Sequence, residues 1–76
     1  MPHVDIKYFP RNLSEEQKQA LSDDIYAVLN KHLQTKESSL SVALTEVAPE
    51  AWKEQVWDPI IQPSLETLVK KPGYSM

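Results

Sequence analysis

Two short stretches of the sequence alternate apolar and polar side chains, and a longer stretch between them repeats apolar side chains with the period of a helix. The alternation over residues 3–9 and 40–47 is the pattern of a strand that buries one face. Residues 14–34 carry apolar side chains three and four positions apart, as in a helix with one side against a core. Two strands joined by such a helix lie parallel, with a right-handed crossover. The sequence therefore predicts an α+β subunit of β-α-β type.

The predicted helix has defined ends and a defined apolar side. Ser14 and Gln17 have the spacing of a capping box, in which each side chain bonds the backbone N–H of the other residue. Pro10 ends the preceding strand because it has no N–H to donate. The side of the helix expected to cover the strands consists of Leu21, Ile25, Val28, Leu29, His32 and Leu33. The strand residues expected beneath it are Val4, Ile6, Leu40, Val42 and Leu44.

Helical patterns also fill the C-terminal third of the chain. We expect a short helix with Pro49 in its first turn and an apolar side made of Trp52, Val56 and Trp57. Asp58-Pro59 has the form of a second helix start, and Pro63 is expected to bend that helix in its first turn. The apolar side of this final helix would consist of Ile61, Leu65, Leu68 and Val69.

A chain of 76 residues without cysteine has room for one small domain and no disulfide to stabilise it. We expect a single domain over residues 1–76, with a β-α-β core at about 2–48 and a helical extension at about 49–71. A two-stranded sheet leaves both edges with unpaired N–H and C=O groups. This favours a homodimer in which two strand pairs join into a four-stranded sheet. The extension would cover surface that a larger oligomer needs, so a hexamer is less favoured.

The composition excludes several classes of partner. The net charge is −3, from 8 basic and 11 acidic residues, and no basic stripe is present for nucleic acid. No apolar run approaches the roughly 20 residues that cross a bilayer, and the polar first strand cannot form a signal-peptide core. We therefore expect a cytoplasmic protein with no membrane partner. His3 and His32 lie far apart, and the only glycine is Gly73, so neither a metal cluster nor a phosphate loop is expected.

Two groups with possible chemistry remain, Pro2 and the only arginine, Arg11. If Met1 is removed, the Pro2 nitrogen becomes a secondary amine; with Met1 attached it is an amide without a basic lone pair. The Arg11 guanidinium presents a fork of donors that fits a carboxylate. Without further information, Arg11 is more simply explained as a solvated side chain at a strand end.

The same residues carry a resemblance to a known family. The chain resembles the 4-oxalocrotonate tautomerase family in Pro2 at the head of a strand, in Arg11 just after that strand, in the capped helix, and in the stretch 45–48. The resemblance covers roughly residues 2–52. Within that family the chain is similar to the bacterial phenylenolpyruvate tautomerase branch in its first strand, in the Trp-bearing segment after the second strand, and in residues 70–76.

The resemblance implies keto–enol tautomerisation of a 2-keto acid without a cofactor or metal. Pro2 would be the general base, and Arg11 would bind the substrate carboxylate and the developing enolate. Ser41 falls where the better-known members carry a second arginine, which favours a monocarboxylate over a dicarboxylate. Trp52 falls on the family's pocket aromatic and would favour an aryl group, as in phenylenolpyruvate.

Several alternatives stay open at this point. Trp52 and Trp57 are equally well core or interface anchors. His3 could tune the pKa of Pro2 or bind substrate, or simply face solvent, and Lys7 could supply a second positive charge. For the whole chain, the competing functions are a dimeric binding or scaffold protein without catalysis, and a hydratase or dehalogenase that uses Pro2 and Arg11.

Overall fold

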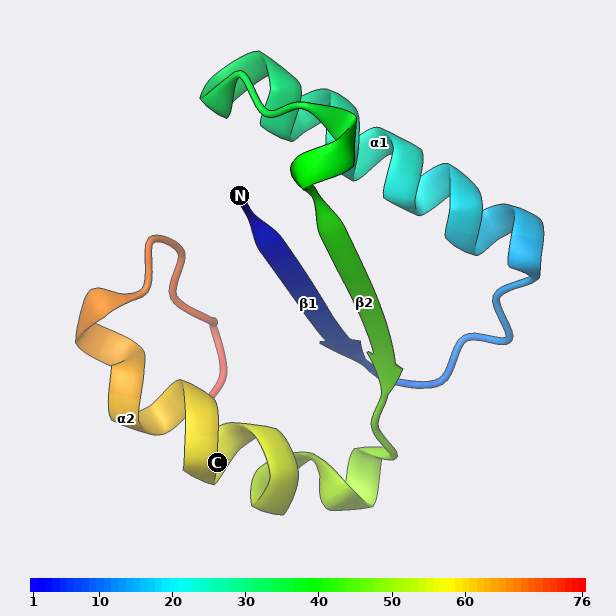
Figure 1. Ribbon diagram of the computed structural model, residues 1–76. Coiled ribbons are helices and arrows are strands. Elements are labelled where there is room, and N and C mark those ends of the chain that lie inside the picture. The colour runs from blue at the N-terminus through cyan, green and yellow to red at the C-terminus, as the bar shows by residue number, and fades with distance from the viewer. The chain divides into compact units, whose positions relative to one another are not determined.

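The computed structural model describes residues 1–76 and divides into two compact units, residues 1–46 and 47–76 (Figure 1). The division falls within two residues of the predicted boundary between the β-α-β core and the extension. Whether the two units behave as one domain stays a prediction. None of the helices is both long enough and apolar enough to cross a membrane.

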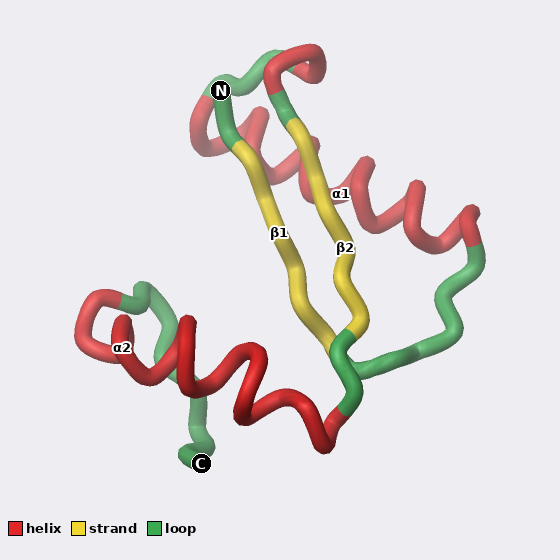
Figure 2. The backbone as a smooth tube through the Cα atoms, turned by 60° about the horizontal axis from the view of Figure 1, so that its bottom comes forward, coloured by secondary structure: helices red, strands yellow, loops and turns green.

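The first unit is a β-α-β unit, as predicted. It consists of β1 (His3–Tyr8), α1 (Glu15–Leu33), the 3₁₀ turn η1 (Glu37–Ser39) and β2 (Ser41–Glu46). β1 and β2 pair in parallel, with Val4 opposite Val42 and Ile6 opposite Leu44. Figure 2 shows the two strands side by side with α1 lying across one face of the pair. Each strand is slightly shorter than the alternation predicts.

The ends of α1 confirm the capping box. The Ser14 hydroxyl accepts the Gln17 N–H at 3.1 Å, and the Gln17 side-chain oxygen accepts the Ser14 N–H at 2.8 Å. At the other end, Gln34 closes the helix in the left-handed region, with φ 52° and ψ 43°. The predicted limits, 14 and 34, are therefore the two cap residues of the observed helix.

The apolar side of α1 is only partly covered. Val4 of β1 and Ile25, Val28 and Leu29 of α1 line an apolar groove that is open to solvent. Val28 is 56% exposed and Leu33 is 59% exposed, and His32 is exposed as well. The prediction that the whole stripe packs on the sheet is therefore wrong for these three residues. Two strands are too narrow to cover an apolar stripe that spans 100° or more of a helix.

The second unit contains η2 (Pro49–Ala51), the π-helix η3 (Lys53–Ile61), α2 (Gln62–Ser64) and the 3₁₀ turn η4 (Leu65–Thr67). Val47, Val56 and Trp57 are its buried apolar residues, each with at most 4% of its surface exposed. Buried Val56 and Trp57 agree with the predicted apolar side of the first C-terminal helix.

The predicted second helix start at Asp58-Pro59 is wrong. The helical backbone continues through Pro59, which lies inside η3 although it has no N–H to donate to the helix. The Asp58 carboxylate does not cap a helix; both of its oxygens accept from Lys53 Nζ at 3.0 Å. The predicted final helix is also too long. Its last helical residue is Thr67, and Leu68 is already extended, with ψ 132°.

Candidate functional site

Pro2 lies at the start of β1, next to the start of β2. Its carbonyl accepts the backbone N–H of Ser41 at 3.3 Å. Ser41 pairs with His3, the residue after Pro2, at the start of the strand pair. Pro2 itself is half-buried, whereas Met1 is fully exposed. The sheet thus fixes the backbone on the carbonyl side of Pro2. On the other side, Met1 adds no buried contact.

The side chains next to Pro2 form a polar pair across the two strands. His3 Nδ1 lies 2.6 Å from Ser41 Oγ, a hydrogen bond between two exposed side chains. Strand alternation puts this pair on the face of the sheet opposite Val4 and Val42, which face α1. Ser41 and His3 therefore both lie beside Pro2, and the Ser41 side chain is oriented by His3.

Asp5 continues the same polar face. Its carboxylate accepts from Lys7 Nζ at 2.5 Å and from the Thr45 hydroxyl at 3.4 Å. The hydrogen bond from Lys7 is the largest cause that holds the pKa of the Asp5 carboxyl below its usual value, with smaller help from Thr45 and the His3 charge. The Lys7 ammonium is thus paired within this face, and Asp5 is a carboxylate at neutral pH.

Arg11 lies at the other end of the strand pair. Its backbone N–H donates at 3.3 Å to the carboxylate of Glu46, the last residue of β2, and its side chain is exposed. Asn12, the next residue, turns the chain with φ 54°. Since β1 spans six residues, Pro2 and Arg11 of one chain are about 20 Å apart along the strand direction. One protomer therefore does not bring these two predicted site residues together.

Trp52 belongs to the second unit, at the residue before η3. It is half-buried, and its indole N–H donates to the Tyr74 hydroxyl at 3.0 Å. The Tyr74 ring also packs on Trp57, with ring centroids 5.4 Å apart and planes tilted by 43°. Trp57 is a core residue, 3% exposed, as the structural alternative predicted for it. Sequence analysis missed Tyr74, because no spacing pattern connects a tail residue to two tryptophans about 20 positions earlier.

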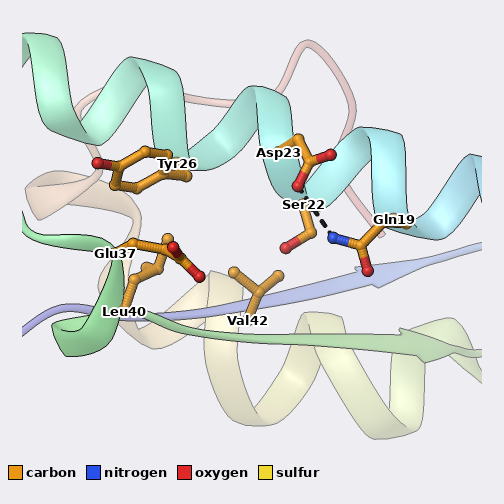
Figure 3. Close-up of a pocket in the computed structure, with 7 residues that line it drawn as sticks. All are labelled: Gln19, Ser22, Asp23, Tyr26, Glu37, Leu40 and Val42. Atoms are coloured by element: carbon orange, nitrogen blue, oxygen red, sulfur yellow. Dashed lines mark hydrogen bonds between the residues drawn. The ribbon is translucent and has the colours of Figure 1, made fainter.

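A pocket of about 370 Å³ lies between α1, η1 and β2 (Figure 3). Its walls carry two carboxylates, Asp23 and Glu37, and its floor is apolar; the lining residues are Gln19, Ser22, Asp23, Tyr26, Glu37, Leu40 and Val42. Gln19 Nε2 donates to Asp23 Oδ1 at 2.9 Å, drawn as the dashed line. None of the predicted site residues lines this pocket. The helical spacing of 19, 22, 23 and 26 is the signal that would have revealed its polar wall in the sequence.

No group of three or more His, Cys, Asp or Glu side chains is arranged to hold a metal ion. What the first unit offers chemically is a residue that becomes a terminal amine when Met1 is removed, with a serine and a histidine beside it. Its single guanidinium lies at the far end of the same strands.

Comparison with known proteins gives a consistent result. A model of the tautomerase family, described as "Tautomerase enzyme", matches residues 2–55. A protein of Cronobacter sakazakii named "Tautomerase PptA" is 62% identical over the whole length of both chains. Proteins with the same name from Pectobacterium carotovorum and Escherichia coli are 59% and 57% identical, over 99% and 100% of both chains.

Proposed function

The chain belongs to the tautomerase family and is an isomerase, and from this membership we propose that it interconverts the enol and keto forms of a 2-keto acid. The proposed base is the nitrogen of Pro2 after removal of Met1, and no cofactor takes part. The proposed substrate carries one carboxylate and an aryl group, as phenylenolpyruvate does, and the proposed location is the cytoplasm.

The position of Pro2 is the observation that carries this proposal. The ring is half-buried at the head of β1, and its carbonyl is held by the Ser41 N–H. Met1 is fully exposed, so its removal breaks no buried contact and leaves the amine on a fixed piece of backbone. The fixed backbone supports this role, because a general base acts from a defined position beside the substrate.

The chemistry needs a base that is neutral at working pH and can return its proton. An α-amine has an ordinary pKa of about 8, and partial burial disfavours its charged form. The Pro2 lone pair would take the enol hydroxyl proton, and the O–H electron pair would form the carbonyl bond. The electrons of the C=C bond would then form a C–H bond with the proton that the Pro2 ammonium returns. The reaction is an isomerisation and needs no other reactant.

Arg11 is the proposed anchor for the carboxylate and the enolate, and we propose that it comes from a second copy of the chain. The separation of about 20 Å within one protomer supports this arrangement. In a homodimer that joins two strand pairs into four strands, an antiparallel join would bring the Arg11 end of one pair to the Pro2 end of the other. The open apolar groove along β1 and α1 supports pairing on that side.

Ser41 and Trp52 are proposed to shape the substrate site. The Ser41 hydroxyl lies beside Pro2 and carries no charge, which suits a substrate with a single carboxylate. The half-buried Trp52 ring offers an aromatic wall for an aryl group.

Enol ketonisation can be followed by ultraviolet absorbance, which makes the test direct. We expect processed protein to ketonise phenylenolpyruvate and the Pro2→Ala variant to be slower by about 10²- to 10⁴-fold, the usual contribution of a general base. Equal rates would contradict the proposal and leave a binding or scaffold protein of the same fold. NMR of the product separates the isomer from a hydrated or dehalogenated acid, the outcome expected for the other alternative.

A further inference from the structure

The C-terminal tail returns to the start of η3 through one residue, Tyr74. After η4 the chain leaves the helical conformation at Leu68 and bends, and Figure 1 shows the tail, in red, ending beside the yellow helix of the same unit. The Tyr74 hydroxyl accepts the Trp52 indole N–H at 3.0 Å, and its ring packs on Trp57 at 5.4 Å between centroids. A single side chain thus contacts both tryptophans of the protein.

The π-helical form of η3 makes this double contact possible. In an α-helix, two residues five positions apart point about 140° away from each other. In a π-helix the hydrogen bonds join residues five positions apart, as Gln62 N–H and Trp57 C=O do here, so such residues lie nearly one above the other. Trp52 and Trp57 therefore share a side of the helix, and Tyr74 reaches both.

The two contacts of Tyr74 have different roles. Trp57 is 3% exposed, so the ring contact attaches the tail to the core of this unit. Trp52 is only half-buried, and an acceptor for its indole N–H restricts the side-chain rotamers that the ring can adopt. The Tyr74 hydroxyl supplies that acceptor.

We propose that Tyr74 is a positioning residue that fixes the orientation of Trp52 and thereby sets the preference of the enzyme for aryl-substituted substrates. This inference rests on the proposed function, in which Trp52 is the wall for the aryl group. Tyr74 acts through Trp52 and takes no part in proton transfer. It should therefore affect how well an aryl substrate is bound and leave the chemical step alone.

The test compares the kinetics of an aryl enol acid, phenylenolpyruvate, with those of an enol acid that carries a short alkyl group. Tyr74→Phe keeps the ring on Trp57 and removes only the hydroxyl. We expect its KM for the aryl substrate to rise about 3- to 10-fold, as for one lost neutral hydrogen bond, with kcat for both substrates and KM for the alkyl substrate unchanged. Trp52→Ala should abolish the aryl preference, and Ser75→Ala, in the same exposed tail, should change nothing.

A second readout does not depend on activity. In a Trp57→Phe background, Trp52 is the only tryptophan, and its fluorescence anisotropy reports how freely the indole moves. Adding Tyr74→Phe should give the anisotropy decay a new fast component. An unchanged decay would overturn the inference, because Trp52 would then not depend on the hydroxyl.

The failures of the two proposals can be told apart. An active, Pro2-dependent enzyme whose aryl preference is unchanged in Tyr74→Phe or in Trp52→Ala would overturn the role of Tyr74 and leave the proposed base intact. A processed wild-type protein that does not tautomerise either substrate, or that works equally well as Pro2→Ala, would overturn the proposed function and this inference with it.

Discussion

Asp5 shows how a single residue connects the two strands on the face opposite α1. Lys7 of its own strand and Thr45 of the neighbouring strand both donate to its carboxylate. These donors stabilise the charged form, which is why the pKa of Asp5 is lower in the folded protein than the usual 3.8. Because Lys7 is paired with Asp5, its ammonium is not a free cation beside Pro2.

The lowered pKa of Asp5 leads to a prediction about stability and pH. A carboxyl group whose pKa is lower in the folded than in the unfolded state stabilises the fold above its unfolded pKa of about 4, and this contribution is lost as the pH falls through the folded value. We expect Asp5→Asn to unfold at a lower temperature than wild type at pH 7, and the difference in Tm to disappear in acid.

The matched control for this prediction is Glu54→Gln, which removes an exposed carboxylate of η3 that has no hydrogen bond or ion pair. Melting curves from pH 7 to pH 2.5 give the comparison. A Tm difference between Asp5→Asn and wild type that stays constant over this range would show that the ion pair contributes nothing to the fold.

The contacts of individual side chains were the features least predictable from the sequence. Pro2 and Arg11 could be selected because few other residues in the chain could act in catalysis or bind a carboxylate, and because both match a family pattern. The hydrogen bond between His3 and Ser41, 38 positions apart in the sequence, depends on the register of the two strands, which alternation alone does not specify. Tyr74 lies in a tail without periodicity, so nothing in its sequence context indicated the two tryptophans that it contacts.

At the scale of elements, α1 was the most predictable because its signals are local. The capping box needs only Ser14 and Gln17 at the right spacing, and the structure has both of its hydrogen bonds. The C-terminal helices were less predictable because their form depends on longer contacts. Lys53 binds the Asp58 side chain that would otherwise cap a helix, and π turns carry the backbone through Pro59.

The cap of α1 also allows a quantitative prediction. Ser14→Ala removes the acceptor for the Gln17 N–H, and we expect it to lower the free energy of unfolding by about 1 kcal/mol. Urea unfolding with a constant slope gives the value. Ser38→Ala, at an exposed serine of η1 without a side-chain hydrogen bond, is the control and should differ from wild type by much less. Equal unfolding of the two variants would mean that the cap does not support the helix.

At the scale of the whole molecule, the parallel β-α-β arrangement followed from the order of the patterns and is confirmed. The sequence predicted the open strand edges, and it placed Pro2 at the head of the first strand and Arg11 just after it, so the length of that strand keeps the two residues apart within one chain. Because one chain does not bring Pro2 and Arg11 together, the proposed site requires the expected dimer.

A subunit-mixing experiment tests this requirement. Pro2→Ala and Arg11→Ala homodimers should each be nearly inactive. If two chains share each site, unfolding and refolding an equal mixture gives half heterodimers, each with one intact site, so about a quarter of wild-type activity should return. Refolding each variant alone is the control. A mixture that stays inactive would contradict a site built from two chains.

The central claim is that the free nitrogen of Pro2 does the chemistry, and the most direct measurement follows one sample while that nitrogen is released. Protein that retains Met1 is treated with methionine aminopeptidase, and the rate of phenylenolpyruvate ketonisation is recorded beside the intact mass. The account predicts a rate that rises in proportion to the fraction of chains without Met1, from almost none. A rate that is already full before Met1 is removed, or that stays flat as it is removed, would contradict it.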